Sequence, residues 1–75
     1  MDVRKKIGLR IRVLRQDLKL TQEKLANLAA IDKTYVNEVE NGKRNISVIN
    51  LEKLVIALGT NFCDFFKTDL FVDEV

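Results

Sequence analysis

The chain has 75 residues, 47% of them hydrophobic, with no histidine, no proline and one cysteine. A chain of this length forms one small domain with a modest core, and these counts exclude an internal disulfide framework and a Cys/His metal site within one chain. The formal net charge is only +2 at pH 7, which by itself is weak evidence for a nucleic-acid partner.

The charge is unevenly distributed. Residues 1–20 carry seven Lys/Arg against two Asp, residues 21–45 carry four of each sign, and residues 46–75 carry two Lys against five acidic residues. An anionic partner would therefore meet the N-terminal half. No apolar run approaches the roughly 20 residues of a membrane span, and the N-terminus lacks the apolar core of a signal peptide. A lone thiol fits a reducing compartment, so we expect a cytoplasmic protein that does not enter membranes.

The first predicted element is an amphipathic helix from about residue 2 to residue 19. Its apolar stripe has spacings of four, four, three and four, which is the period of one helix face: Val3, Ile7, Ile11, Leu14 and Leu18. The other faces carry basic side chains that either stay solvated or contact phosphates: Arg4, Lys5, Lys6, Arg10, Arg12 and Lys19.

Two short helices separated by about three residues are predicted next. Thr21 caps the first, over residues 22–29, and Asp32 caps the second, over residues 33–40, which ends at Asn41-Gly42. This is the geometry of a helix-turn-helix. The predicted inward positions are Leu25, Ala26, Leu28, Ala29, Ile31, Val36 and Val39. The outward side chains of the second helix are polar and can read base edges.

The C-terminal part predicts two more helices. Ser47 caps a fourth helix, with Ile46 packing onto Leu51, and Gly59 ends it. Its buried stripe is Leu51, Leu54, Val55 and Leu58. Thr60 or Asn61 caps a short fifth helix, in which Cys63 is expected as a small buried residue. Four of the five aromatic residues are Phe at or after position 62, and they either close the core or form a dimer patch.

The sequence thus predicts an all-α fold of five helices. Its domain would span residues 1–67 and would be followed by a short acidic tail, residues 68–75. This tail either frays, or residues 70–72 fold back on the dimer.

The helix-turn-helix stretch resembles the phage-repressor type, known as the XRE or Cro/C1 family. The resemblance lies in Gln22, in Leu25-Ala26 and in Glu40-Asn41-Gly42, and it covers nearly the whole chain. Residues 32–47, DKTYVNEVENGKRNIS, are most similar to restriction–modification controller proteins, which are small dimeric regulators of about this length. Ala30 stands where the family usually has Gly in the turn. In a left-handed conformation, Ala there costs on the order of 1 kcal/mol relative to Gly.

The resemblance also implies roles for particular residues. Arg15 and Glu40 would form a half-buried ion pair that ties the first helix to the recognition helix. Gln22 would bridge a phosphate and the recognition helix. The family's dimers meet through their last two helices, which here implies an interface drawn from Ile49, Ile56, Phe62, Phe65 and Phe66.

The candidate DNA-binding residues lie on and after the recognition helix. Lys33 and Thr34 open this helix and would contact bases. The remaining candidates each have an alternative role in packing, in capping or as solvated surface: Tyr35, Asn37, Glu38, Lys43, Arg44, Asn45, Ser47 and Asn50.

The leading hypothesis is a homodimeric, sequence-specific transcription regulator of a palindromic operator in double-stranded DNA. The resemblance implies a controller of its own gene and of a restriction endonuclease gene, with RNA polymerase as a further candidate partner. The first alternative is an antitoxin or protein-interaction module of the same fold that binds DNA weakly. The second is a membrane-surface peptide, because the first helix is basic and amphipathic, although its stripe is needed to close the core. We expect no enzyme, metal or cofactor, since His, a Gly-rich phosphate loop and paired carboxylates with a supporting base are all missing.

Overall fold

The fold is described from a computed structural model, which places residues 1–72. Within this range every regular element is a helix. The elements are α1 (Val3–Asp17), α2 (Gln22–Ala29), α3 (Lys33–Glu40), α4 (Val48–Ala57), α5 (Phe62–Phe65) and a 3-10 helix η1 (Asp69–Phe71). The all-α class with five α-helices is therefore confirmed, and α2 and α3 have the predicted bounds.

Local capping explains where the helices begin. Each α-helix has an N-cap side chain that accepts a hydrogen bond from a backbone N–H in the first turn, and these caps are Asp2, Thr21, Asp32, Ser47 and Asn61. The helix ends follow from left-handed residues. Lys19 (φ 57°) stops α1 earlier than predicted, and Ala30 (φ 55°) follows α2. Gly59 (φ 73°) follows α4, as expected for a glycine that reverses the chain.

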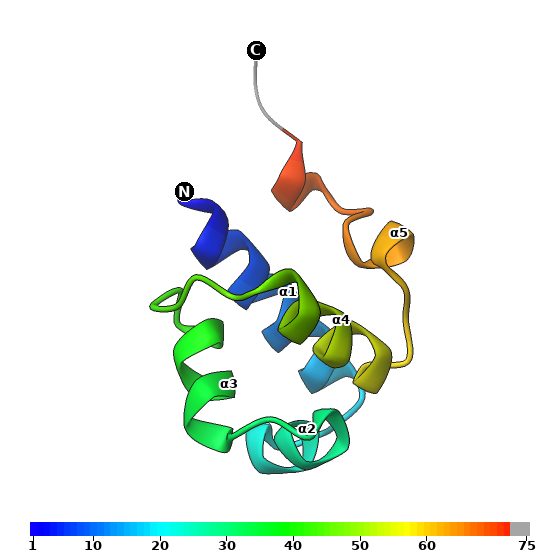
Figure 1. Cartoon of the computed structure of the whole chain (residues 1–75). Helices are drawn as coiled ribbons and strands as arrows, with labels where there is room; N and C mark the ends of the chain where they lie inside the picture. Colours follow the sequence, from blue (N-terminus) through cyan, green and yellow to red (C-terminus); the bar gives the residue numbers. More distant parts are fainter. Residues whose placement is uncertain (73–75) are drawn as a thin grey trace.

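The helices surround one core. Helix α3 packs on α1 and α2, α2 also packs on α4, and α4 contacts α5 (Figure 1). In Figure 1, α2 and α3 lie at the lower and left sides, and α5 lies at the right. The core side chains are Ile11, Leu25, Ala26, Ala29, Val36, Val39, Leu51, Leu54, Val55, Leu58 and Phe65. Within residues 1–72, this arrangement leaves the outward face of α3 free of other helices. None of the helices in residues 1–72 has the length and hydrophobicity that crossing a bilayer requires.

Four predicted inward positions are wrong. Val3 and Leu18 are exposed, because they lie at the two ends of α1, beyond its contacts with the other helices. Leu28 is also exposed, since the inward face of the short α2 is already taken by its other apolar residues. Cys63 is exposed on α5, a helix of one turn that turns other side chains inward.

The C-terminal segment belongs to the folded unit. Helix η1 packs on α1 of the same chain, and the Phe71 ring lies 6.3 Å from that of Phe65 and 4.8 Å from that of Phe66, between ring centroids. The predicted domain boundary at residue 67 is therefore too early, because Phe71 covers the aromatic end of the core. Of the predicted tail, residues 73–75 lie outside the described residues.

Arg10 binds within the protein, a role that the sequence did not indicate. Its Nε donates to the Phe65 carbonyl oxygen at 2.7 Å, and its Nη2 donates to the Asp64 carbonyl oxygen at 3.0 Å. A guanidinium at the C-terminal end of a helix satisfies carbonyl groups that have no partner within that helix. Arg10 therefore fixes α5 to α1.

Candidate nucleic-acid interface

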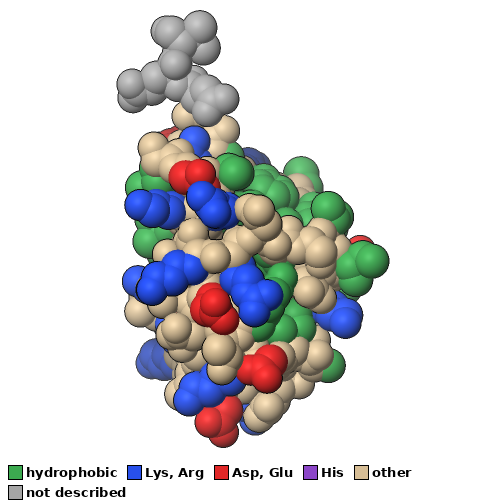
Figure 2. Space-filling view, turned by 60° about the vertical axis from the view of Figure 1, so that its left-hand side comes forward, with side chains coloured by type: hydrophobic (Ala, Val, Ile, Leu, Met, Phe, Trp, Pro, Cys, Tyr) green, Lys and Arg blue, Asp and Glu red, His purple; other side chains and the backbone are tan. Residues whose placement is uncertain are grey.

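Helix α3 presents its polar residues on one outward face. Val36 and Val39 anchor the helix in the core, while Lys33, Thr34 and Asn37 are exposed. Figure 2 turns the side of the molecule that carries α3 toward the viewer. Lys and Arg side chains are spread across this face, with acidic side chains between them. The surface is thus polar and of mixed charge, and it has the donors and acceptors that base recognition needs.

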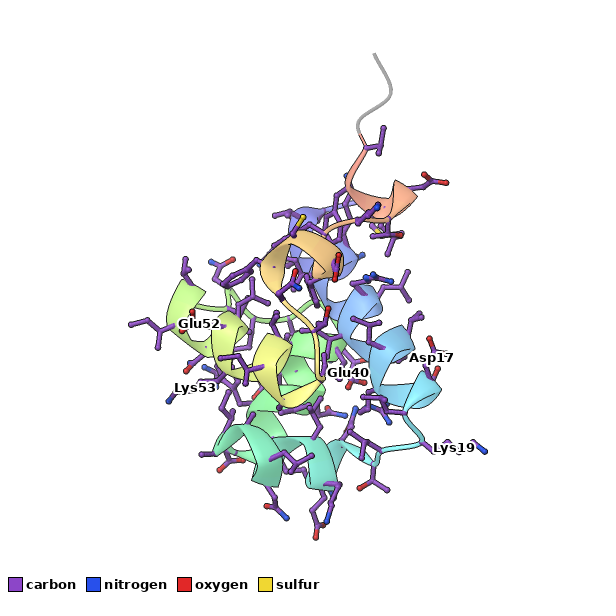
Figure 3. All side chains as sticks on the ribbon, turned by 90° about the vertical axis from the view of Figure 1, so that its right-hand side faces the viewer. Asp17, Lys19, Glu40, Glu52 and Lys53 are labelled. Atoms are coloured by element: carbon purple, nitrogen blue, oxygen red, sulfur yellow. The ribbon has the colours of Figure 1, made fainter. Side chains whose placement is uncertain are left out.

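A buried carboxylate lies directly behind this face. Glu40 is only 4% exposed, and Figure 3 places it inside the ribbon framework, whereas the labelled Asp17, Lys19, Glu52 and Lys53 lie at its edges. Arg15 forms the ion pair that the resemblance implied, with Nε to Oε2 at 2.6 Å and Nη2 to Oε1 at 2.9 Å. A bidentate guanidinium–carboxylate pair also fixes the relative orientation of its two helices.

The surroundings of Glu40 keep it ionised. Burial by itself raises the pKa of Glu40, but hydrogen bonds from Arg15 and Gln22 outweigh this effect, so the pKa lies below its ordinary value. The hydrogen bond with Glu40 likewise raises the pKa of Arg15. The pair is therefore fully charged near neutral pH.

Gln22 joins this buried pair to the exposed face of α3. Its Nε2 donates to Glu40 Oε1 at 3.0 Å, and its Oε1 accepts from Asn37 Nδ2 at 3.1 Å. The predicted link from Gln22 to the recognition helix therefore exists. Its predicted contact with a phosphate stays a prediction.

Two further residues complete the network, Arg12 and Asn41. Arg12 Nη2 donates to Asn41 Oδ1 at 3.0 Å, and its Nε lies 3.4 Å from Glu40 Oε1. Asn41 Nδ2 donates to the Asn37 backbone oxygen at 2.9 Å and lies 3.4 Å from Asn37 Oδ1. Sequence patterns did not indicate these roles. The one available signal was that Arg12 and Arg15 are three apart and share a helix face.

A shallow hollow of about 590 Å³ opens beside this network. It is lined by Arg15, Thr21, Gln22, Glu23 and Lys33. Lys33 Nζ lies 3.9 Å from Glu23 Oε2, and both side chains are largely exposed. A surface pair of this kind is weak, so Lys33 can exchange Glu23 for another anion at little cost.

The loop after α3 supplies the remaining predicted contacts. Lys43, Arg44 and Asn45 are all exposed. Arg44 lies 3.6 Å from Glu38, nitrogen to oxygen, and its guanidinium carbon lies 4.8 Å from the centroid of the Tyr35 ring. Of the two roles considered for Tyr35, the structure contains the packing contact.

The two predicted residues at the start of α4 bind within the protein. Ser47 Oγ accepts from the Asn50 backbone N–H at 3.1 Å, so it acts as the helix cap. Asn50 Nδ2 donates to the Tyr35 hydroxyl at 3.3 Å. Phosphate contacts by Ser47 and Asn50 remain untested predictions.

A second exposed surface lies on α4 and α5. Ile49 and Ile56 are 69% and 66% exposed, on the outward face of α4, and Phe66 is 37% exposed. Phe62 is partly buried against the core. Phe65 has no exposed surface, so its predicted place in a dimer interface is wrong. Its ring fills the core under α4, and the Arg10 contacts hold it there.

Comparison with known proteins agrees with this geometry. A helix-turn-helix family model matches residues 11–65. The control protein C.MunI of Mycoplasma sp. is 38% identical over 67 residues, which cover 88% of this chain and 90% of that protein.

Two solved structures have the same fold. The restriction–modification controller protein C.AhdI from Aeromonas hydrophila superposes with a TM-score of 0.81 at 43% identity, over 84% of this chain and 96% of that one. The controller protein C.Esp1396I, as a tetramer in complex with its natural 35 base-pair operator, gives a TM-score of 0.85 at 28% identity, over 89% of this chain and 88% of that one. The chain therefore belongs to the helix-turn-helix family of XRE (Cro/C1) type, and it is similar within that family to restriction–modification controller proteins.

Proposed function

We propose that this protein is a sequence-specific transcription regulator that binds a palindromic operator as a homodimer. We further propose that it acts as a restriction–modification controller, which regulates its own gene and that of an endonuclease. The observation that carries the proposal is the exposed polar face of α3, held from behind by the buried Arg15–Glu40 pair and by Gln22. The similarity to C.MunI over most of both chains supports the finer assignment.

The proposal gives each part of the interface a task. Lys33 and Thr34, at the N-terminal end of α3, contact base edges in the major groove. Gln22 and the loop residues Lys43–Asn45 hold the phosphate backbone, which positions the helix but does not specify sequence.

Homodimerisation follows from the size of one such unit, because a single recognition helix contacts few base pairs. Two copies related by a two-fold axis place their recognition helices about 34 Å apart, one turn of DNA. The exposed apolar side chains of Ile49, Ile56 and Phe66, with the partly buried Phe62 beside them, provide the contact surface.

We also propose that the protein works in the cytoplasm, has no catalytic activity, and contacts RNA polymerase when it activates transcription. The acidic balance of residues 46–75 supports a protein-facing rather than a DNA-facing role for that half. Transcription in vitro from a promoter with the selected operator, with purified polymerase, tests this contact.

The main test is selection from a random-duplex pool at near-physiological salt, followed by sequencing of the retained DNA. Two enriched inverted half-sites about one turn apart are expected. Thr34→Ala should change the enriched bases. Lys43→Ala should weaken binding to all sequences alike and reduce the salt slope by about one. Lys67 is an exposed lysine outside the proposed DNA interface, so Lys67→Ala is the control and should leave DNA binding unchanged. Salt-sensitive bulk binding without enrichment would contradict the proposal and point to an interaction module.

A further inference from the structure

We infer that Asn37 reads an adenine, and that Glu40 and Arg12 fix the direction of its amide through Gln22 and Asn41. This inference rests on the proposed function and deepens it. It names a base, a reader and the residues that position the reader. The carrying observation is a closed ring of hydrogen bonds, Glu40–Gln22–Asn37–Asn41–Arg12–Glu40, which connects a buried charge to the outward face of α3.

The carboxylate fixes the ring from one side. An ionised carboxylate only accepts hydrogen bonds, so the Gln22 group that faces Glu40 at 3.0 Å must be its NH₂. The Gln22 oxygen then faces Asn37, which must donate across the 3.1 Å contact. The NH₂ of Asn37 is therefore directed toward α2.

The guanidinium fixes the ring from the other side. Arginine only donates, so the Asn41 group that faces Arg12 at 3.0 Å must be its oxygen. The Asn41 NH₂ then faces Asn37, where it meets the backbone oxygen at 2.9 Å and Oδ1 at 3.4 Å. The two assignments are independent and agree: Asn37 has its NH₂ toward Gln22 and its oxygen toward Asn41. Reversing the Asn37 amide would oppose two oxygens at one end and two NH₂ groups at the other.

This orientation leaves a defined pattern for a ligand. Asn37 is exposed on α3, and it keeps one N–H and one oxygen lone pair after its contacts within the ring. A neighbouring donor and acceptor match N7 and N6 of adenine in the major groove. Guanine presents two acceptors at its edge and cytosine one donor, so each satisfies only half of the Asn37 amide.

The test measures base discrimination separately from affinity. Binding is measured for the selected operator and for all of its single base-pair variants, with five proteins: wild type, Asn37→Ala, Gln22→Met, the double variant that combines these two changes, and Asn27→Ala. Asn27 is an exposed asparagine on α2, outside the ring, and it controls for the loss of a surface amide.

Wild type should prefer adenine at one position of each half-site by roughly 5- to 150-fold, the range for a bidentate contact. Asn37→Ala should abolish the preference at that position only, and Asn27→Ala should keep the wild-type profile. Gln22→Met should weaken binding to all sequences, through its lost phosphate contact, and should also reduce the preference at the position that Asn37 reads. In the double variant, Gln22→Met should have no further effect on that position.

Two results would overturn the inference. One is an Asn37→Ala variant whose base preferences all match wild type. The other is a Gln22→Met variant that weakens binding while the preference at the Asn37 position stays intact, because a merely structural Gln22 would have this effect.

A measurement without DNA separates this inference from the proposed function. The hydrogen-bonded side-chain NH₂ proton of Gln22 and that of Asn37 should exchange slowly with water in NMR spectra of the free wild-type protein, and the side-chain NH₂ protons of Asn27 should exchange fast. Slow exchange together with a selection that enriches no sequence would contradict both the proposed function and the adenine assignment, but it would support the hydrogen-bonded ring. Fast exchange at Gln22 and Asn37, beside an enriched operator, would overturn the fixed amide direction alone.

Discussion

Gly8 of α1 lies so close to the backbone of Glu40 that no side chain fits between the two helices. A Cβ added at Gly8 would lie 2.8 Å from the Glu40 carbonyl oxygen, and closer still to that of Val39. Glycine weakens a helix by roughly 1 kcal/mol relative to alanine. Its presence allows the close crossing of α1 and α3 that brings Arg12 and Arg15 onto the Glu40 carboxylate.

Gly8→Ala should therefore destabilise the protein, although alanine is the better helix former. The clash is with rigid backbone, so the expected loss is about 1–3 kcal/mol in the free energy of unfolding, measured by urea titration. Gly59→Ala is the comparison without a clash: no described atom lies within 4 Å of its added Cβ, so only the positive φ opposes the change, at a cost of roughly 1–2 kcal/mol. A Gly8→Ala variant as stable as wild type would show that the crossing can relax.

Replacing Ala30 by glycine should stabilise the protein. Ala30 has φ 55° in the turn between α2 and α3, and Lys19 has φ 57° after α1. A left-handed residue with a Cβ costs roughly 1–2 kcal/mol, part of which is offset by the greater chain entropy that glycine loses on folding. Ala30→Gly and Lys19→Gly should each raise the midpoint of thermal unfolding, whereas Ala29→Gly, within the helix, should lower it. No gain at Ala30 would mean that the turn stabilises the alanine by other contacts.

The Arg15–Glu40 pair should dominate the acid sensitivity of the fold. The pKa of Glu40 is lowered in the folded state, so its stabilising contribution is complete well above its ordinary value, about 4.5, and is lost as the pH falls through the folded value. Unfolding curves between pH 7 and pH 2 should therefore show a decline that Glu40→Gln flattens. Asp2→Asn is the control. Its hydrogen bond with Arg4 also lowers the pKa of the Asp2 carboxylate, but this group is exposed, so its replacement should change the pH dependence little.

Arg15→Ala should lower stability at neutral pH by roughly 3–5 kcal/mol, since it leaves a buried carboxylate without its main partner. Chemical denaturation gives this value directly. Arg4→Ala, which breaks the exposed pair with Asp2 at 3.0 Å, should change it little. Equal effects of the two variants would contradict a special role for the buried pair.

Variants in the C-terminal half of the chain should affect either folding or dimerisation, but not both. Phe65→Ala empties a fully buried site and should cost about 3–5 kcal/mol in stability. Ile56→Lys should leave the fold intact and dissociate the proposed dimer, as measured by sedimentation velocity at several concentrations. Val13→Lys, at an exposed apolar position on α1, is the control. A dimer that survives Ile56→Lys would place the interface elsewhere.

Local sequence signals were enough to predict where most of the helices begin and end. The caps Thr21, Asp32 and Ser47 and the chain reversal at Gly59 each act within a few residues, so the bounds of α2 and α3 followed from the sequence. Periodicity likewise identified the buried stripe of α4. The family resemblance supplied the Arg15–Glu40 pair, which no local pattern would have paired across 25 residues.

Only the tertiary structure decided which apolar and polar side chains have partners. Leu28 and Cys63 are exposed and Phe65 is fully buried, because burial depends on where neighbouring helices end, which periodicity does not contain. The same holds for the contacts of Arg10 with α5 and for the ring through Arg12 and Asn41. These contacts join residues from different helices, and those of Arg12 also need the close approach of α1 and α3 that Gly8 allows.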